Sequence, residues 1–253
     1  MTKTDISKVS SILILFKFGT AEHLLSFREL GLLHMRTMRY FAELEIDSAR
    51  GDRLEGTAEM IQPSDVGDFI IEHPLFGKHT VDPKELTGPV TLLLNREADQ
   101  NIFCMFGLTK PREKPLHSDV LDLGTFFVLV LNTPEFLKRI RLAAQAASLR
   151  IEARPVEYFD EAKYSGRVGP FKKSSRYIHQ SEYRVVVSPG LSDYRELIVG
   201  SLEDITTPVL PVAEIDGLVD FSPESARAAG IHWDGEPKDS PKLAVEGSAI
   251  TKL

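Results

Sequence analysis

Residues 171–187 read F-K-K-S-S-R-Y-I-H-Q-S-E-Y-R-V-V-V, a polar segment that leads directly into an apolar one. The apolar half alternates between two faces with the period of a β-strand, and its three valines are strong strand formers. If the strand already begins at Gln180, the side chains of Gln180 and Glu182 emerge on the same face at its start. The segment therefore predicts a strand that presents a carboxamide and a carboxylate to one space.

The rest of the chain predicts an α+β fold with a mostly antiparallel sheet and a few helices. Hydrophobic alternation and capping residues place strands at 11–18, 32–40, 90–94, 102–108, 125–131, 156–160 and 196–200, a strand pair within 202–215, and helices at 21–30, 134–147 and 222–230. Thr20 and Thr133 are the expected N-caps of the first two helices. The polar connection at 95–101 predicts that the strands on either side of it pair as an antiparallel hairpin.

The 253 residues, 42% of them hydrophobic and 26% charged, fit a soluble globular protein. One domain is expected over residues 1–233, with a polar insert at about 61–89. Residues 234–253 are rich in Pro, Gly, Ser and Lys and hold little apolar surface, which predicts a flexible C-terminal tail.

Charge and cysteine content exclude several classes of protein. The formal net charge of −7 argues against non-specific electrostatic binding of nucleic acid. The single cysteine, Cys104, excludes an internal disulfide and a cysteine zinc cluster, and its apolar neighbours predict a buried thiol with no catalytic role. The apolar run at 12–16 is far shorter than the roughly 20 residues that span a bilayer. We therefore expect a cytoplasmic protein that does not enter the membrane.

Residues 43–56 form a second polar segment, with seven ionisable side chains and two glycines in fourteen residues. One interpretation is a solvated loop whose acids are neutralised by arginines. Another is a ligand loop, in which Gly51 permits an unusual turn and a flanking arginine presents its planar guanidinium to a pyrophosphate. Arg50 is the first candidate for that role and Arg53 the second.

The Gln180-Ser181-Glu182 sequence resembles the catalytic signature of ADP-ribosyltransferases, in which the glutamate holds the nicotinamide-ribose of NAD. The early strand followed by a helix also agrees with that family, although Lys17 stands where its first strand usually carries an arginine or histidine. The chain is similar as well to a group of uncharacterised bacterial proteins that are often linked to toxins and phage defence. The shared features are an aromatic-Lys-aromatic first strand, an R-G-D-x-x-E-G loop (residues 50–56 here) and a late Q-x-E-[YF]-R strand.

This resemblance implies an ADP-ribosyltransferase-like split sheet and the transfer of ADP-ribose from NAD to a macromolecular acceptor, either protein or nucleic acid. The protein would act as a toxin or an anti-phage effector, with an antitoxin or another defence protein as a possible partner. Glu182 would oppose the positive charge that develops on the ribose, and Gln180 would position the acceptor nucleophile. No metal ion is expected to take part.

The resemblance also implies residues that bind NAD. Lys17, Arg50 and Lys172 would hold its pyrophosphate, and Phe18 and Tyr177 would stack on nicotinamide. The alternative for the two aromatic residues is a place in the core, and for Lys172 a solvated run of charge.

Two other classes of function remain open. A non-catalytic binding or adaptor protein would carry Gln180 and Glu182 on a solvated strand. A metal-dependent nuclease would use the carboxylates of Asp47, Asp52, Glu55 and Glu182.

Overall fold

The computed structural model of the chain describes residues 14–44, 51–67, 69–94, 99–108, 116, 118–218, 222 and 224. Asp47, Arg50 and the tail at 234–253 lie outside these described residues, and so does most of the helix expected at 222–230. No helix in the described part of the chain combines the length and the apolar character that crossing a membrane requires.

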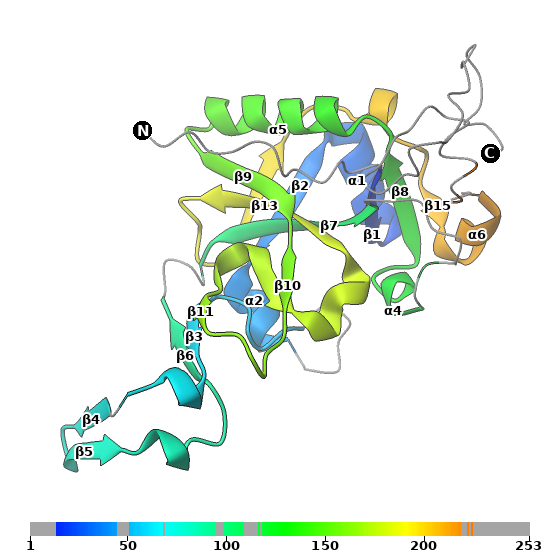
Figure 1. The fold of residues 1–253 in the computed structure, drawn as a ribbon. Helices are drawn as coiled ribbons and strands as arrows, with labels where there is room; N and C mark the ends of the chain where they lie inside the picture. The colour runs from blue at the N-terminus through cyan, green and yellow to red at the C-terminus, as the bar shows by residue number, and fades with distance from the viewer. Residues whose placement is uncertain are drawn as a thin grey trace, which may run out of the picture.

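The fold is α+β with mostly antiparallel pairing, as the sequence predicts (Figure 1). In chain order its helices and strands are β1 (Ile14–Gly19), α1 (Ala21–Leu30), β2 (Leu32–Thr37), α2 (Met38–Glu43), β3 (Thr57–Ile61), β4 (Phe69–His73), β5 (Gly77–Val81), β6 (Val90–Leu93), β7 (Asn101–Leu108), α4 (Ser118–Leu121), β8 (Phe126–Val130), α5 (Thr133–Ala146), β9 (Arg150–Pro155), β10 (Glu157–Phe159), β11 (Gly166–Arg167), β12 (Lys172–Ser174), β13 (Glu182–Ser188), β14 (Tyr194–Ile198), β15 (Leu210–Pro211) and α6 (Ile215–Leu218).

The largest sheet has the strand order β14-β2-β7-β1-β8-β15, with β13 on the opposite edge of β7 and β9 beyond β13. β1 and β2 share one edge of β7, because β2 pairs with residues 101–102 and β1 with residues 106–108. Residues 103–105 of β7 lie between them and pair with neither of the two strands. The sheet therefore splits along this edge.

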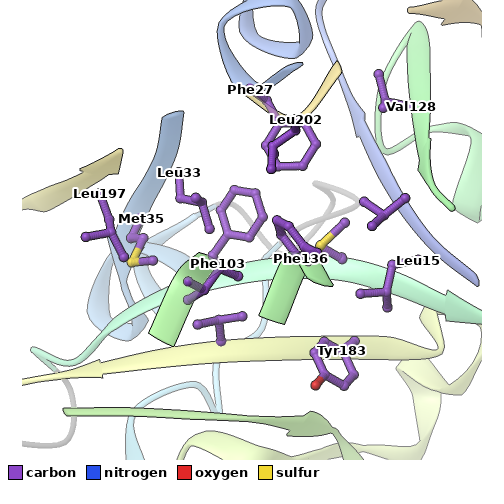
Figure 2. Packing of buried hydrophobic residues seen from close by; sticks show 14 of the residues in the cluster. Leu15, Phe27, Leu33, Met35, Phe103, Val128, Phe136, Tyr183, Leu197 and Leu202 are labelled. Atoms are coloured by element: carbon purple, nitrogen blue, oxygen red, sulfur yellow. The ribbon is translucent and has the colours of Figure 1, made fainter. Parts of the chain in front are cut away.

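The two longest helices, α1 and α5, cover one face of this sheet and form the larger core with it (Figure 2). Phe27 of α1 stacks on Phe103 of β7 with 5.8 Å between ring centroids, and it meets Phe136 of α5 edge to face at 5.9 Å. Burial of each such side chain contributes about 1.5–3 kcal/mol to folding. Tyr183 and Val185 of β13 point into the same core. Because side chains alternate along a strand, Glu182 and its even-numbered neighbours point to the opposite face.

Short-range signals fix the ends of the two helices. The Thr20 side chain caps α1 as predicted, and Gly31 ends the helix with a φ of 65°, where an added Cβ would lie 2.0 Å from a backbone oxygen. The predicted cap of α5 is wrong by one residue. Asn132 accepts the hydrogen bond from the backbone N–H of Glu135, and Thr133 is the first residue of the helix.

The hairpin predicted from residues 90–94 and 102–108 is wrong. β6 pairs with β3 instead, and β7 is a central strand that pairs with β1, β2 and β13. The strand pair expected within 202–215 is also wrong, because only the two-residue β15 forms there, between 3-10 helices at 203–205 and 212–214. In both regions the sequence pattern indicates extended, apolar chain but carries no information on which distant strand it will meet.

The insert is a projecting hairpin. β4 and β5 pair with each other, and Figure 1 shows them extending from the body of the molecule on the side away from α5. Four large apolar side chains are exposed on the insert: Ile70, Ile71, Leu75 and Phe76.

Candidate functional site

Gln180 and Glu182 do not share a strand. β13 begins at Glu182, whereas Gln180 ends a 3-10 helix at 175–180, and Ser181 between them adopts the left-handed conformation with a φ of 41°. Their side chains nevertheless meet at Lys173 of β12. The Lys173 Nζ lies 2.9 Å from Gln180 Oε1 and 3.2 Å from Glu182 Oε2. The sequence therefore predicted the convergence but not the backbone that produces it.

Arg184 joins Glu182 to a distant carboxylate. Its Nε donates to Glu182 Oε1 at 2.8 Å, its Nη1 donates to Glu55 Oε2 at 3.0 Å, and its Nη2 donates to Glu55 Oε1. Each of these side chains is at most 7% exposed, and so is that of Lys173. We refer to Glu55, Lys173, Glu182 and Arg184 as the ion cluster.

The charges of the ion cluster stabilise one another. Burial alone would raise the pKa of Glu182, but Arg184 and Lys173 outweigh burial and hold this pKa well below its ordinary value. Burial alone would lower the pKa of Lys173 and of Arg184, but in each case the carboxylates, Glu182 first, outweigh it and raise the pKa. With both carboxylates ionised, two positive and two negative charges leave the cluster neutral.

A fifth ionisable group, Asp52, lies beside the ion cluster and titrates differently. Burial and then the neighbouring charge of Glu55 raise the pKa of Asp52 to about 6. Its side chain is tied to its own loop, because Asp52 Oδ1 accepts a hydrogen bond from the backbone N–H of Leu54 at 3.0 Å. The solvated-loop interpretation of residues 43–56 is wrong for Asp52 and Glu55, which are each only 3% exposed.

The carboxylates proposed for a metal-dependent nuclease are placed against cations. Glu55 and Glu182 both face Arg184 and Lys173, so fixed positive side chains stand where a metal ion would bind. Within the described residues, no group of three or more His, Cys, Asp or Glu side chains is arranged to hold a metal ion.

A cavity of about 620 Å³ opens where β1 and β2 diverge. It joins the ion cluster to residues of the strands and of α2, and its lining includes Glu55, Lys173, Gln180, Glu182 and Arg184 at one end and Lys17, Phe18, His34, Arg36 and Tyr40 along its walls. A pocket of this volume is in the range of about 300–1,000 Å³ that small-molecule and cofactor sites occupy.

The β1 residues predicted to bind a cofactor reach this cavity. Lys17 Nζ lies 4.2 Å from the centroid of the Phe103 ring and donates to the backbone oxygen of Cys104 at 2.8 Å. It thus satisfies a carbonyl group in the stretch of β7 that pairs with neither β1 nor β2. Phe18 borders the cavity but is only 5% exposed, because its ring packs against those of Phe16 and Phe127.

Other predicted residues lie outside the cavity. Lys172 donates to the hydroxyl group of Tyr164 and sits 4.4 Å above its ring, and Arg53 is mostly exposed and pairs with Glu161. Neither residue lines the cavity, and neither does Tyr177. Tyr177 still contacts a site residue, because its ring centroid is 4.8 Å from the Nζ of Lys173.

Sequence reasoning missed Lys173 and Arg184 as site residues, and it considered Glu55 only as a ligand of the metal-dependent nuclease. A signal existed for Arg184, since it is two residues from Glu182 and therefore on the same face of β13. Glu55 of the R-G-D-x-x-E-G loop and Arg184 of the Q-x-E-Y-R strand are also opposite charges in two motifs of the sequence.

Cys104 pairs with Arg184 across the sheet and lies next to the ion cluster. Burial and then the charge of Glu182 raise the pKa of its thiol above its ordinary range. The thiol is therefore protonated at neutral pH and is a poor nucleophile. The sequence predicts a buried residue, whereas Cys104 is only partly buried and borders the cavity.

Comparisons with known proteins do not assign the chain to a family. No protein-family model, no curated protein and no solved structure matches the chain.

Proposed function

We propose that the cavity binds NAD and that the protein transfers ADP-ribose from it to a macromolecular acceptor, as a toxin or an anti-phage effector. One observation supports this proposal most directly. Gln180 and Glu182 meet at Lys173, at the end of a cavity large enough for a cofactor, whose walls carry Lys17, Arg36 and aromatic rings.

The reaction would break the bond between C1′ of the ribose and the ring nitrogen of nicotinamide. The bonding electrons leave with nicotinamide, and C1′ passes through an oxocarbenium-like state with positive charge. A nucleophile of the acceptor then bonds to C1′ and loses its proton. A carboxylate beside C1′ stabilises the positive charge, and Glu182 is the carboxylate of the Q-x-E sequence that borders the cavity.

The loop acids give this mechanism its charge balance. Glu182 with Lys173 and Arg184 alone would carry one net positive charge, which would oppose an oxocarbenium-like state. Glu55 brings the sum to zero, and ionised Asp52 adds one further negative charge. The acids of the R-G-D-x-x-E-G loop would therefore remove the net positive charge at this end of the cavity, where the oxocarbenium-like state would form.

A non-catalytic binding protein is the second candidate, because one observation favours it. Both oxygens of Glu182 already accept hydrogen bonds from side-chain cations, Oε1 from Arg184 and Oε2 from Arg184 and Lys173. A carboxylate held in this way can serve the fold alone. NAD would then bind in the cavity without being consumed.

Release of nicotinamide from NAD separates the two candidates. We expect the purified protein to release nicotinamide and Glu182→Gln to do so at least ~100-fold more slowly, because the variant lacks one charge directed at the transition state. Glu152→Gln is the matched control, since Glu152 is an exposed carboxylate that pairs with Arg154 away from the cavity. Circular dichroism of each variant verifies that the fold is intact. Equal rates in the folded Glu182→Gln variant and the wild type would refute the catalytic role, and bound but unconsumed NAD would establish the binding protein.

A further inference from the structure

The wall of the cavity far from Glu182 carries a cluster of rings around one guanidinium group. Arg36 of β2 lies 4.9 Å from the ring centroid of Tyr40 and 5.5 Å from that of Tyr194. His34, two residues earlier on the same face of β2, stacks on Tyr194 at 5.0 Å with 26° between the ring planes. We refer to His34, Arg36, Tyr40 and Tyr194 as the aromatic platform.

The aromatic platform is open to a ligand. The two tyrosines are 40% and 45% exposed, and His34, Arg36 and Tyr40 line the cavity. Arg36 pairs with Asp193 at 2.8 Å, but the Asp193 side chain is 72% exposed. An exposed ion pair of this kind contributes little stability, so an anionic ligand can replace Asp193 at low cost.

The platform and the ion cluster lie at two separate ends of one cavity. On β7, Arg36 pairs with Ile102 on one edge, and Glu182 pairs with Phe106 on the other. Four residues at ~3.3 Å along the strand and two strand spacings of ~4.8 Å across the sheet place the two Cα atoms roughly 16 Å apart. Such a separation suits a ligand with two heads joined by a linker and not a single nucleoside.

We propose that the aromatic platform binds the purine base and the adjacent phosphate of a dinucleotide whose other half lies at Glu182. Exposed aromatic faces bind nucleobases by stacking, and a guanidinium group adds both a stacking surface and a charged donor for phosphate. The inference rests on the proposed function for the identity of the dinucleotide as NAD, but it concerns binding alone. The half-ligand for this end is therefore AMP, and that for the Glu182 end is nicotinamide mononucleotide.

Isothermal titration calorimetry with the two half-ligands tests the proposal without any turnover. We expect AMP to bind the wild-type protein and Arg36→Ala to weaken its affinity at least ~10-fold, with affinity for nicotinamide mononucleotide changed less than about twofold. Tyr40→Ala should show the same selectivity with a smaller loss. Arg154→Ala is the matched control, because Arg154 also stacks on a ring, that of Phe171 at 4.1 Å, but does not line the cavity.

Each outcome separates this inference from the proposed function. Loss of AMP affinity in Arg36→Ala supports the platform even if the protein never releases nicotinamide from NAD. Three results would overturn the platform while leaving the proposed function standing: no AMP binding by the wild type, AMP binding that is equal in Arg36→Ala and Arg154→Ala, or an equal loss for both half-ligands.

Discussion

Arg184 and Arg139 each bridge two carboxylates, Arg184 inside the molecule and Arg139 on its surface. Arg184 joins Glu55 and Glu182 with its side chain 1% exposed, whereas Arg139 of α5 joins Glu135 and Asp204 with its side chain 22% exposed. The hydrogen bonds of Arg139 are as short as 2.5 Å, so contact geometry does not distinguish the two sites. What differs is access of water, which replaces a lost partner at the surface but not in the interior.

Removal of each arginine gives the largest contrast. We expect Arg184→Ala to lower the free energy of unfolding by about 3–5 kcal/mol, because Glu55 and Glu182 would share a buried site with only Lys173 to oppose them. Arg139→Ala exposes its two carboxylates to water and should leave the unfolding midpoint nearly unchanged. Urea titrations followed by circular dichroism measure both. Similar losses in the two variants would show that burial does not determine how much each arginine contributes to the free energy of unfolding.

The pH dependence of stability gives a second, smaller contrast between the regions. The pKa of Asp52 is raised from 3.8 to about 6, chiefly by burial, whereas hydrogen bonds from Arg139 lower the pKa of Asp204. Between pH 4 and 6 the folded protein therefore holds a proton on Asp52 that the unfolded chain has lost. The contribution of Asp52 to stability is fully present below pH 4, falls as the pH rises through 6, and is constant above that.

Asp52→Asn isolates this effect, because the variant keeps an oxygen for the Leu54 N–H but cannot titrate. Relative to the wild type, the variant should gain up to about 3 kcal/mol between pH 4 and pH 7, since each pKa unit corresponds to about 1.4 kcal/mol. Asp204→Asn should show the opposite sign, with stability lost relative to the wild type at pH 7 and not at low pH. Urea titrations at several pH values supply the comparison. A pH-independent difference for Asp52→Asn would mean that Asp52 has an ordinary pKa.

The sequence predicts the parts of this molecule that local chemistry decides. Thr20 and Gly31 bound α1 because a hydroxyl cap and a left-handed turn act within a few residues, and the valines of β13 indicate a strand wherever that strand pairs. The contact between Glu55 and Arg184 spans 129 residues, and no local pattern encodes it. The same holds for β6 and β7, whose true partners come from other parts of the chain.

The candidate site shows the same limit at the level of one residue. Lys172 and Lys173 are adjacent and chemically identical, yet Lys173 is buried at the ion cluster and Lys172 points to Tyr164. Which of two neighbours faces inward depends on the pairing of β12 with β10, which is parallel and begins with Glu157 opposite Lys172. A shift of one residue in that register would exchange the two lysines. Sequence alone could therefore place a lysine near Glu182 but could not choose which one.

Salt should produce the smallest effect and the finest distinction between the two arginines. Raising NaCl from 0.1 M to 1 M shortens the Debye length from about 10 Å to about 3 Å, so charges in contact with solvent interact less. The small difference between the wild type and Arg139→Ala should then disappear, while the difference between the wild type and Arg184→Ala should persist, because the side chains of the ion cluster are at most 7% exposed and salt screens them little. Since NaCl also changes the stability of every variant, only differences measured at the same salt concentration are compared. If the Arg184→Ala difference shrinks as well, the ion cluster is open to solvent, and Glu182 then loses the low-dielectric surroundings that would let one carboxylate stabilise positive charge on a ribose.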